Sequence, residues 1–118
     1  MNYSLKDVKI PYYAKKYNTE ELVKKIINTY HDDEKDDQEK KRKIGRYCTA
    51  ISIRNIKKLV PKEAPKAAKQ AFTEKAFEIV DKIEKLYNDS ITDKSEKKRK
   101  ISRYSLAIAL RRGAINLK

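Results

Sequence analysis

The sequence predicts an all-α protein, a four-helix bundle built from two tandemly duplicated helical hairpins. Three observations support this class: an internal repeat, apolar residues at helical spacing, and a scarcity of residues that break helices. The 118-residue chain contains only two glycines and three prolines, too few for the many tight turns of a β protein. Its length suits a single domain, residues 1–118, with a core of its own.

The repeat has an offset of 57 residues. Residues 39–54 and 96–111 are identical at eleven of sixteen positions without a gap. Over residues 21–54, eighteen of 34 positions match the residue 57 further on. A lone helical hairpin cannot bury its own apolar stripe, so we expect the two copies to share one core. The predicted divisions are an N-terminal arm at 1–17, a first hairpin at 18–60, a linker at 61–66 and a second hairpin at 67–118.

Residues 1–17 show no clear hydrophobic period and contain one proline and four of the eight tyrosines: Tyr3, Tyr12, Tyr13 and Tyr17. We expect an extended arm. It either packs on the bundle or contacts a partner through its tyrosines and through Lys15 and Lys16.

Capping pairs mark the helix starts of the first hairpin. Asn18 with Glu21, and Asp36 with Glu39, have the spacing of an N-cap and its reciprocal acid. Leu22, Val23, Ile26, Ile27 and Tyr30 then share one face, as do Ile44, Tyr47, Cys48, Ile51 and Leu59. In the second copy we expect one helix from about Lys66 to Asn88 and another from Asp93 towards Arg112, ended by Gly113.

The chain is strongly basic, with 30 Lys and Arg against 17 Asp and Glu, a net charge of +13. The excess is similar in both halves, so it belongs to the folded units and favours a polyanionic partner such as nucleic acid. The single cysteine, Cys48, fits a reducing compartment. No segment resembles a signal peptide or approaches membrane-spanning length. We therefore expect a cytoplasmic or nucleoid protein that is not secreted and has no membrane partner.

A run of cations repeats on the second helix of each hairpin, and no acid occurs from Lys40 to Lys58 or from Lys97 to the C-terminus. Helices that need only solubility usually interleave acids on the outer face. Cations near a helix start also oppose the helix dipole, so a negative partner would explain them. We call this set the basic stripe: Lys40, Lys41, Arg42, Lys43, Arg46, Arg54 and Lys57, with Lys97, Lys98, Arg99, Lys100, Arg103, Arg111 and Arg112.

Ile53 and its counterpart Leu110 interrupt the basic stripe and suggest a second interface. They could pack within the chain, meet another subunit, or contact sugar or base. If both are covered in the monomer, the remaining outer surface is almost purely cationic; if both are exposed, a protein interface becomes more probable.

The sequence gives little support for catalysis or metal binding. The cluster from His31 to Asp37 lacks EF-hand spacing and loses most of its ligands in the second copy, so we expect a capped hinge and no metal or cofactor. His31 is the only histidine, and no catalytic constellation recurs between the copies. Cys48 becomes Ser105, which indicates a small core residue. We expect no enzyme.

The resulting hypothesis is a non-catalytic protein that binds the backbone of RNA or DNA with little sequence specificity. A small subunit of a ribonucleoprotein or effector complex fits, with other subunits as partners; a CRISPR-type small subunit is compatible by size and charge. The alternatives are a plasmid, phage or chromatin DNA-binding protein, and a protein-interaction or scaffold module for an acidic partner. A solvated face neutralised by acids from neighbouring loops is the simplest explanation of the charge.

Overall fold

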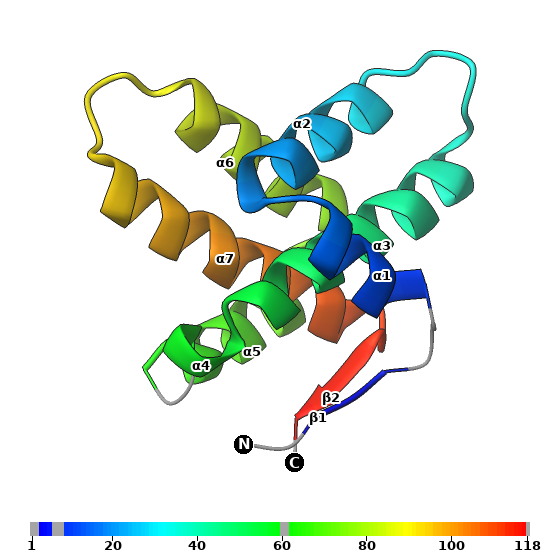
Figure 1. Ribbon diagram of the computed structural model, residues 1–118. Helices are drawn as coiled ribbons and strands as arrows, with labels where there is room; N and C mark the ends of the chain where they lie inside the picture. Colours follow the sequence, from blue (N-terminus) through cyan, green and yellow to red (C-terminus); the bar gives the residue numbers. More distant parts are fainter. Residues whose placement is uncertain (1–2, 6–8, 60–61, 118) are drawn as a thin grey trace.

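The computed structural model of the chain describes residues 3–5, 9–59 and 62–117 (Figure 1). Its helical character confirms the predicted all-α class. The helices are α1 (Lys9–Lys16), α2 (Thr19–Tyr30), α3 (Asp37–Arg54), α4 (Ile56–Leu59), α5 (Ala64–Thr73), α6 (Ala76–Asn88) and α7 (Lys94–Arg111). Two short strands, β1 (Tyr3–Leu5) and β2 (Ile115–Leu117), pair antiparallel and join the two ends of the chain.

The four-helix bundle of two hairpins is not confirmed, because the described residues form seven helices, α1 to α4 in the first copy and α5 to α7 in the second. Residues 9–16, which the sequence predicted to be extended, form α1 and bury Ile10 and Ala14. Shifted by 57, they fall on residues 66–73, which lie within α5. The repeat therefore extends further towards the N-terminus than sequence identity shows. Residues 1–2 and 6–8 of the predicted arm lie outside the described part of the chain.

The predicted continuous helix from Lys66 to Asn88 is also wrong, since it divides into α5 and α6 at Glu74 and Lys75. Lys75 is extended, with φ −79° and ψ 155°. Its backbone N–H donates to the Glu78 carboxylate at 2.9 Å, which restarts the helix. The predicted linker 61–66 is shorter than expected, because residues 64–66 already belong to the first turn of α5, where Pro65 is well tolerated.

The predicted N-cap residues Asn18, Asp36 and Asp93 are confirmed. The Glu21 backbone N–H donates to the Asn18 side chain at 2.8 Å, and the Glu21 carboxylate accepts from the Asn18 backbone at 3.0 Å. The side chains of Asp36 and Asp93 accept from the third residue of α3 and of α7 respectively. Gly113, with φ 67°, follows the end of α7 in the left-handed conformation that favours glycine.

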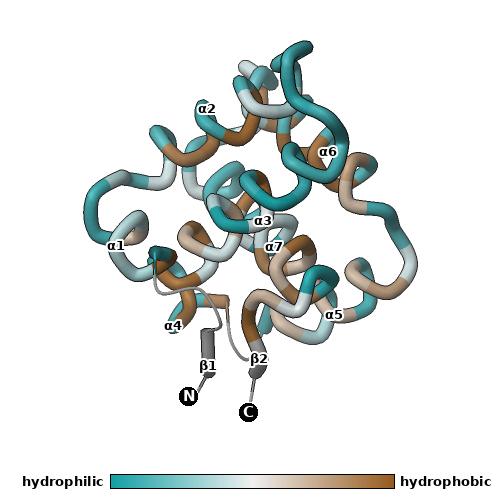
Figure 2. The backbone as a smooth tube through the Cα atoms, turned by 90° about the vertical axis from the view of Figure 1, so that its right-hand side faces the viewer, coloured by the Kyte–Doolittle hydropathy of each residue, from teal (hydrophilic) through white to brown (hydrophobic). Residues whose placement is uncertain are grey.

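Helices α3 and α7 pack against each other at the centre, with α1 and α2 against α3 and with α5 and α6 against α7 (Figure 1). Small residues allow the two central helices to approach: Cys48, Ser52, Ser105 and Ala109 are all fully buried. Every residue of 48–52 and of 105–109 is buried, so the C-terminal halves of both helices are surrounded. Figure 2 shows hydrophobic stretches within the helices and largely hydrophilic loops and helix ends.

Candidate nucleic-acid interface

The structure divides the basic stripe into peripheral and internal parts. The N-terminal ends of α3 and α7 lie on opposite sides of the molecule (Figure 1). The clusters at residues 40–43 and 97–100 are therefore two separate basic regions and do not form one continuous face. Towards the C-terminal ends the helices are surrounded, and the cations there take part in packing.

Arg54 and Arg111 hold the first helix of each copy, α1 and α5, in place. Arg54 donates from Nη1 to the carbonyl oxygen of Ala14 in α1. Arg111 donates from Nη1 to the carbonyl of Ala71 in α5 at 3.1 Å. Both donors and both acceptors are related by the 57-residue offset. The last carbonyls of a helix lack intrahelical partners, and a basic side chain satisfies one of them. This pair of contacts explains why an arginine recurs at this position.

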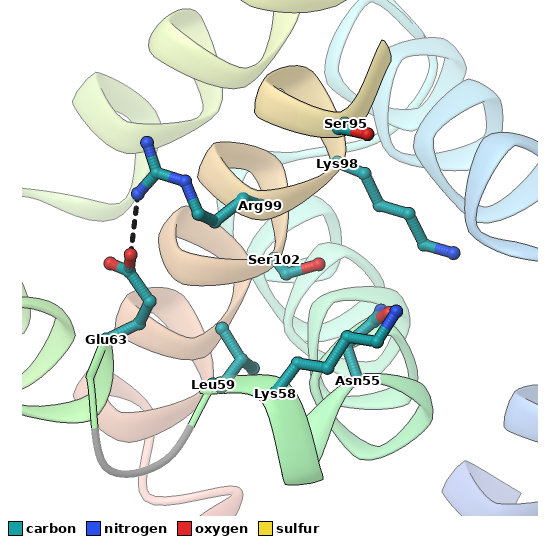
Figure 3. Close-up of a pocket in the computed structure, with 8 residues that line it drawn as sticks. All are labelled: Asn55, Lys58, Leu59, Glu63, Ser95, Lys98, Arg99 and Ser102. Carbon is teal, nitrogen blue, oxygen red and sulfur yellow. Dashed lines mark hydrogen bonds and ion pairs between the residues drawn. The ribbon is translucent and has the colours of Figure 1, made fainter.

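Arg99 and Arg103 are neutralised by an acid that the sequence reasoning did not identify. Glu63 is only 5% exposed. It accepts from Arg99 Nη1 at 2.6 Å (Figure 3) and from Arg103 Nη1 at 3.1 Å. Burial would raise the pKa of Glu63, but the two arginines outweigh burial and hold that pKa below its ordinary value. Glu63 lies 36 residues from Arg99 and 40 residues from Arg103 in sequence. The spacing of residues along one helix therefore could not predict these contacts.

Surface acids pair with further cations of the stripe. Lys100 contacts Glu96 at 3.1 Å, Arg99 approaches the same carboxylate at 3.9 Å, and Arg42 lies 4.0 Å from Glu39. These acids sit in the first turns of α3 and α7. Part of the stripe is thus paired with acids of its own helices, which differ from the loop acids that the simplest explanation of the charge invoked.

The other stripe residues differ in their surroundings. Lys41 lies over the Phe77 ring, 5.3 Å from its centroid, and Lys97 donates weakly to the Tyr87 carbonyl at 3.4 Å. Lys40, Lys43 and Arg46 are half-buried, and Arg46 makes interactions of its own. The exposed members besides Arg42, Arg54, Arg99 and Arg111 are Lys57, Lys98 and Arg112. Among the described carboxylates, none forms an ion pair with Lys57 or Lys98.

Ile53 and Leu110 are half-buried and pack against the core. Both are therefore largely covered within the monomer. By the criterion set out from the sequence, this weakens a protein interface centred on these two residues and leaves a mainly cationic surface around them.

Two hollows adjoin the basic start of α7. The larger, which we call the basic groove, has a volume of about 590 Å³ and runs between the N-terminus of α2 and α7. It is lined by Asn18, Thr19, Glu20, Val23, Arg54, Tyr87, Lys94, Lys97, Lys98 and Ile101. The smaller, of about 220 Å³, contains the Glu63–Arg99 ion pair. Lys98 lines both hollows and extends away from Arg99 and Glu63 (Figure 3).

Cys48 and His31, the residues considered for catalysis or metal binding, both contact neighbouring side chains of the fold. Burial raises the pKa of the Cys48 thiol to about 12, despite a contact with Ser105 that lowers it. His31 Nε2 lies 2.7 Å from the Glu84 carboxylate and so joins the two repeats. Within residues 3–5, 9–59 and 62–117, no group of three or more His, Cys, Asp or Glu side chains could hold a metal ion. In the same part of the chain, no helix is long and apolar enough to cross a membrane.

Comparison with protein-family models, curated proteins and solved structures finds no match for this chain. The fold and the site describe an all-helical protein whose described residues form seven helices in two repeats, with a basic groove beside the second central helix, α7.

Proposed function

We propose that the protein binds nucleic acid without catalysis, through the phosphate backbone and with little sequence specificity. The observation that carries the proposal is the set of exposed lysines around the start of α7 and at α4: Lys57, Lys58, Lys94 and Lys98. None of them forms an ion pair with a described carboxylate. In a chain of net charge +13, these ammonium groups remain available to phosphates.

The kinds of cation that remain available support low specificity. Reading of guanine in duplex DNA depends mainly on the two-pronged guanidinium of arginine. Here Arg54, Arg99, Arg103 and Arg111 are all engaged within the chain, and the other exposed arginines of the stripe are Arg42 and Arg112. Lysines act as point charges on phosphates, which fixes position along a strand without selecting sequence.

Such a protein suits a subunit of a larger assembly on RNA or DNA. Two basic regions on opposite sides of the molecule would contact separate segments of one polyanion. A small subunit of a ribonucleoprotein or effector complex in the cytoplasm or nucleoid, of which a CRISPR-type small subunit is one form, needs this property. A plasmid, phage or chromatin protein would use the same contacts on DNA.

A protein-interaction module for an acidic partner is the second candidate, and one observation favours it. Phe72 on α5 is 90% exposed and Ile91 between α6 and α7 is 93% exposed. Their counterparts in the first copy are Lys15 and Glu34, so neither position serves the shared fold. Large exposed apolar side chains on an otherwise polar surface are suited to protein contact.

The test is binding to labelled single-stranded RNA, single-stranded DNA and duplex DNA of equal length, followed by fluorescence anisotropy across a salt titration. Phosphate-driven binding gives a linear fall of log affinity against log salt. The double variant Lys94→Ala/Lys98→Ala should reduce that slope for a single strand by about 1.4, because each lost phosphate contact removes about 0.7.

The matched control is Lys66→Ala/Lys69→Ala, which removes two exposed lysines from α5, outside the basic groove. It should leave the slope close to that of the wild type. Equal slopes for both double variants would contradict the proposed location. Absence of binding to all three nucleic acids at low salt would contradict the function and direct attention to an acidic protein partner.

A further inference from the structure

We infer that the basic groove accepts an unpaired nucleobase, stacked against Tyr87 beside Lys98, so that the protein prefers single strands. The inference rests on the proposed nucleic-acid function and specifies the form of its ligand. It comes from a difference between two places related by the repeat, each formed by residues of both copies, one of which is filled by an aromatic ring of the chain.

In the filled place the ring is Phe77 of the second copy, near the start of α6, and it contacts Tyr30 and Lys41 of the first copy. Its centroid lies 5.4 Å from that of Tyr30, at 51° between the planes, and the Lys41 ammonium lies 5.3 Å from the Phe77 centroid. Phe77 is half-buried and packs against the core. Contacts of one ring with another aromatic ring and with a cation are both favourable for its π system.

In the open place, the offset of 57 replaces this ring by Glu20 of the first copy, while Tyr87 and Lys98 of the second copy lie where Tyr30 and Lys41 lie in the filled place. Glu20 is exposed, and the Tyr87 hydroxyl lies 3.5 Å from its carboxylate. Among the described residues, Glu20 takes the position of the Phe77 ring, and Glu20, Tyr87 and Lys98 all line the groove.

The floor is apolar in both places. Val23 and Ile101 are buried beneath the open groove. Their counterparts Val80 and Ile44 are buried in the filled place. Each place therefore has an apolar floor, a tyrosine and a lysine, and the group at the position of the Phe77 ring differs.

The positive charge of the residues around the groove indicates an anionic occupant. Lys94, Lys97, Lys98 and Arg54 line the groove against a single acid, Glu20. An aromatic group attached to phosphates satisfies both the apolar floor and this cationic rim, which is the chemistry of a nucleotide within a strand. Sequence-tolerant binding of single strands commonly combines base stacking on aromatic side chains with a cationic track for the backbone. Bases paired within a duplex are not available for such stacking.

The test fills the groove from within by Glu20→Phe, which reproduces the side chain of the other copy. Affinity for a single strand of about eight nucleotides should fall by about tenfold, since a stacked base is lost. Affinity for duplex DNA should not fall. The control Glu20→Ala leaves the groove open and removes its acid, so it should bind a single strand at least as tightly as the wild type. Thermal unfolding of each variant verifies that the fold is intact.

A strand with abasic sites retains its phosphates and provides a second readout. The wild type should bind it more weakly than the intact strand, whereas Glu20→Phe should bind both equally. If Glu20→Phe binds the intact strand like the wild type while Lys94→Ala/Lys98→Ala weakens binding, the groove inference fails and the phosphate-binding function stands. If the wild type binds no nucleic acid, both fail.

Discussion

Glu63 shows how a single buried residue alters the meaning of a charge pattern. Its carboxylate joins the start of α5 to two arginines of α7 and occupies a site that excludes most solvent. An acid in such a place stabilises the fold only while it is ionised and paired. The arginines that seemed available for phosphate are therefore part of the packing of α5 on α7.

Glu63→Gln should lower the free energy of unfolding by about 1–2 kcal/mol at neutral pH, because charged hydrogen bonds are lost at a site where one partner is half-exposed. The folded-state pKa of Glu63 lies below its ordinary value of 4.5. Its contribution is complete above that value and disappears as the pH falls through the lowered folded-state pKa. Urea unfolding should therefore show a difference between wild type and variant that shrinks in acid. Glu96→Gln, which alters a surface pair, is the control and should change stability less.

At the scale of elements, each copy attaches its first helix, α1 or α5, by the same arginine-to-carbonyl hydrogen bond. Arg54 and Arg111 reach from the ends of α3 and α7 to the last turns of α1 and α5. Between α2 and α6 the contacts instead differ from copy to copy. Tyr30 donates to Asp81 at 2.7 Å. This hydrogen bond and burial together raise the pKa of Tyr30 to about 12. The repeat thus retains its attachment of helices while its surface side chains diverge.

Arg54→Ala and Arg111→Ala should each destabilise the protein by about 1 kcal/mol, the usual net worth of one such hydrogen bond. Each should also increase hydrogen exchange in the helix that the arginine contacts, α1 for Arg54 and α5 for Arg111. Exchange measured by mass spectrometry separates the two. Arg111→Ala lies outside the basic groove and should leave the salt slope of nucleic-acid binding unchanged. A clear reduction of that slope would instead make Arg111 a phosphate ligand.

At the scale of the whole molecule, the two repeats depend on each other. The surrounded halves of α3 and α7, residues 48–52 and 105–109, contain no exposed position. Separating the copies would expose Cys48, Ile51, Leu106 and Ile108 to water together. Because burial of such surface is the main favourable term in folding, neither half retains enough of it alone.

A polypeptide of residues 62–118 should therefore not be a folded monomer. Far-UV circular dichroism should show low helicity at low concentration, and sedimentation should show self-association wherever helicity appears. Mixing it with residues 1–61 should restore the helicity of the full chain. A helical monomer of either half, with cooperative unfolding, would contradict this dependence.

The sequence alone determined what local chemistry decides. Capping pairs around Asn18, Asp36 and Asp93 satisfy backbone groups within one turn, and apolar spacing defines a buried face, so the helix class, the caps and the repeat were readable. Only the tertiary structure decided the roles of Glu63, Arg54 and Arg111, since their partners lie 36 to 40 residues away. It also decided that residues 9–16 are helical and that Phe77 fills a place which Glu20 leaves open. These outcomes depend on the packing of helices against each other, within one copy for Glu63, Arg54 and Arg111 and between the copies for Phe77, and no single helix contains that information.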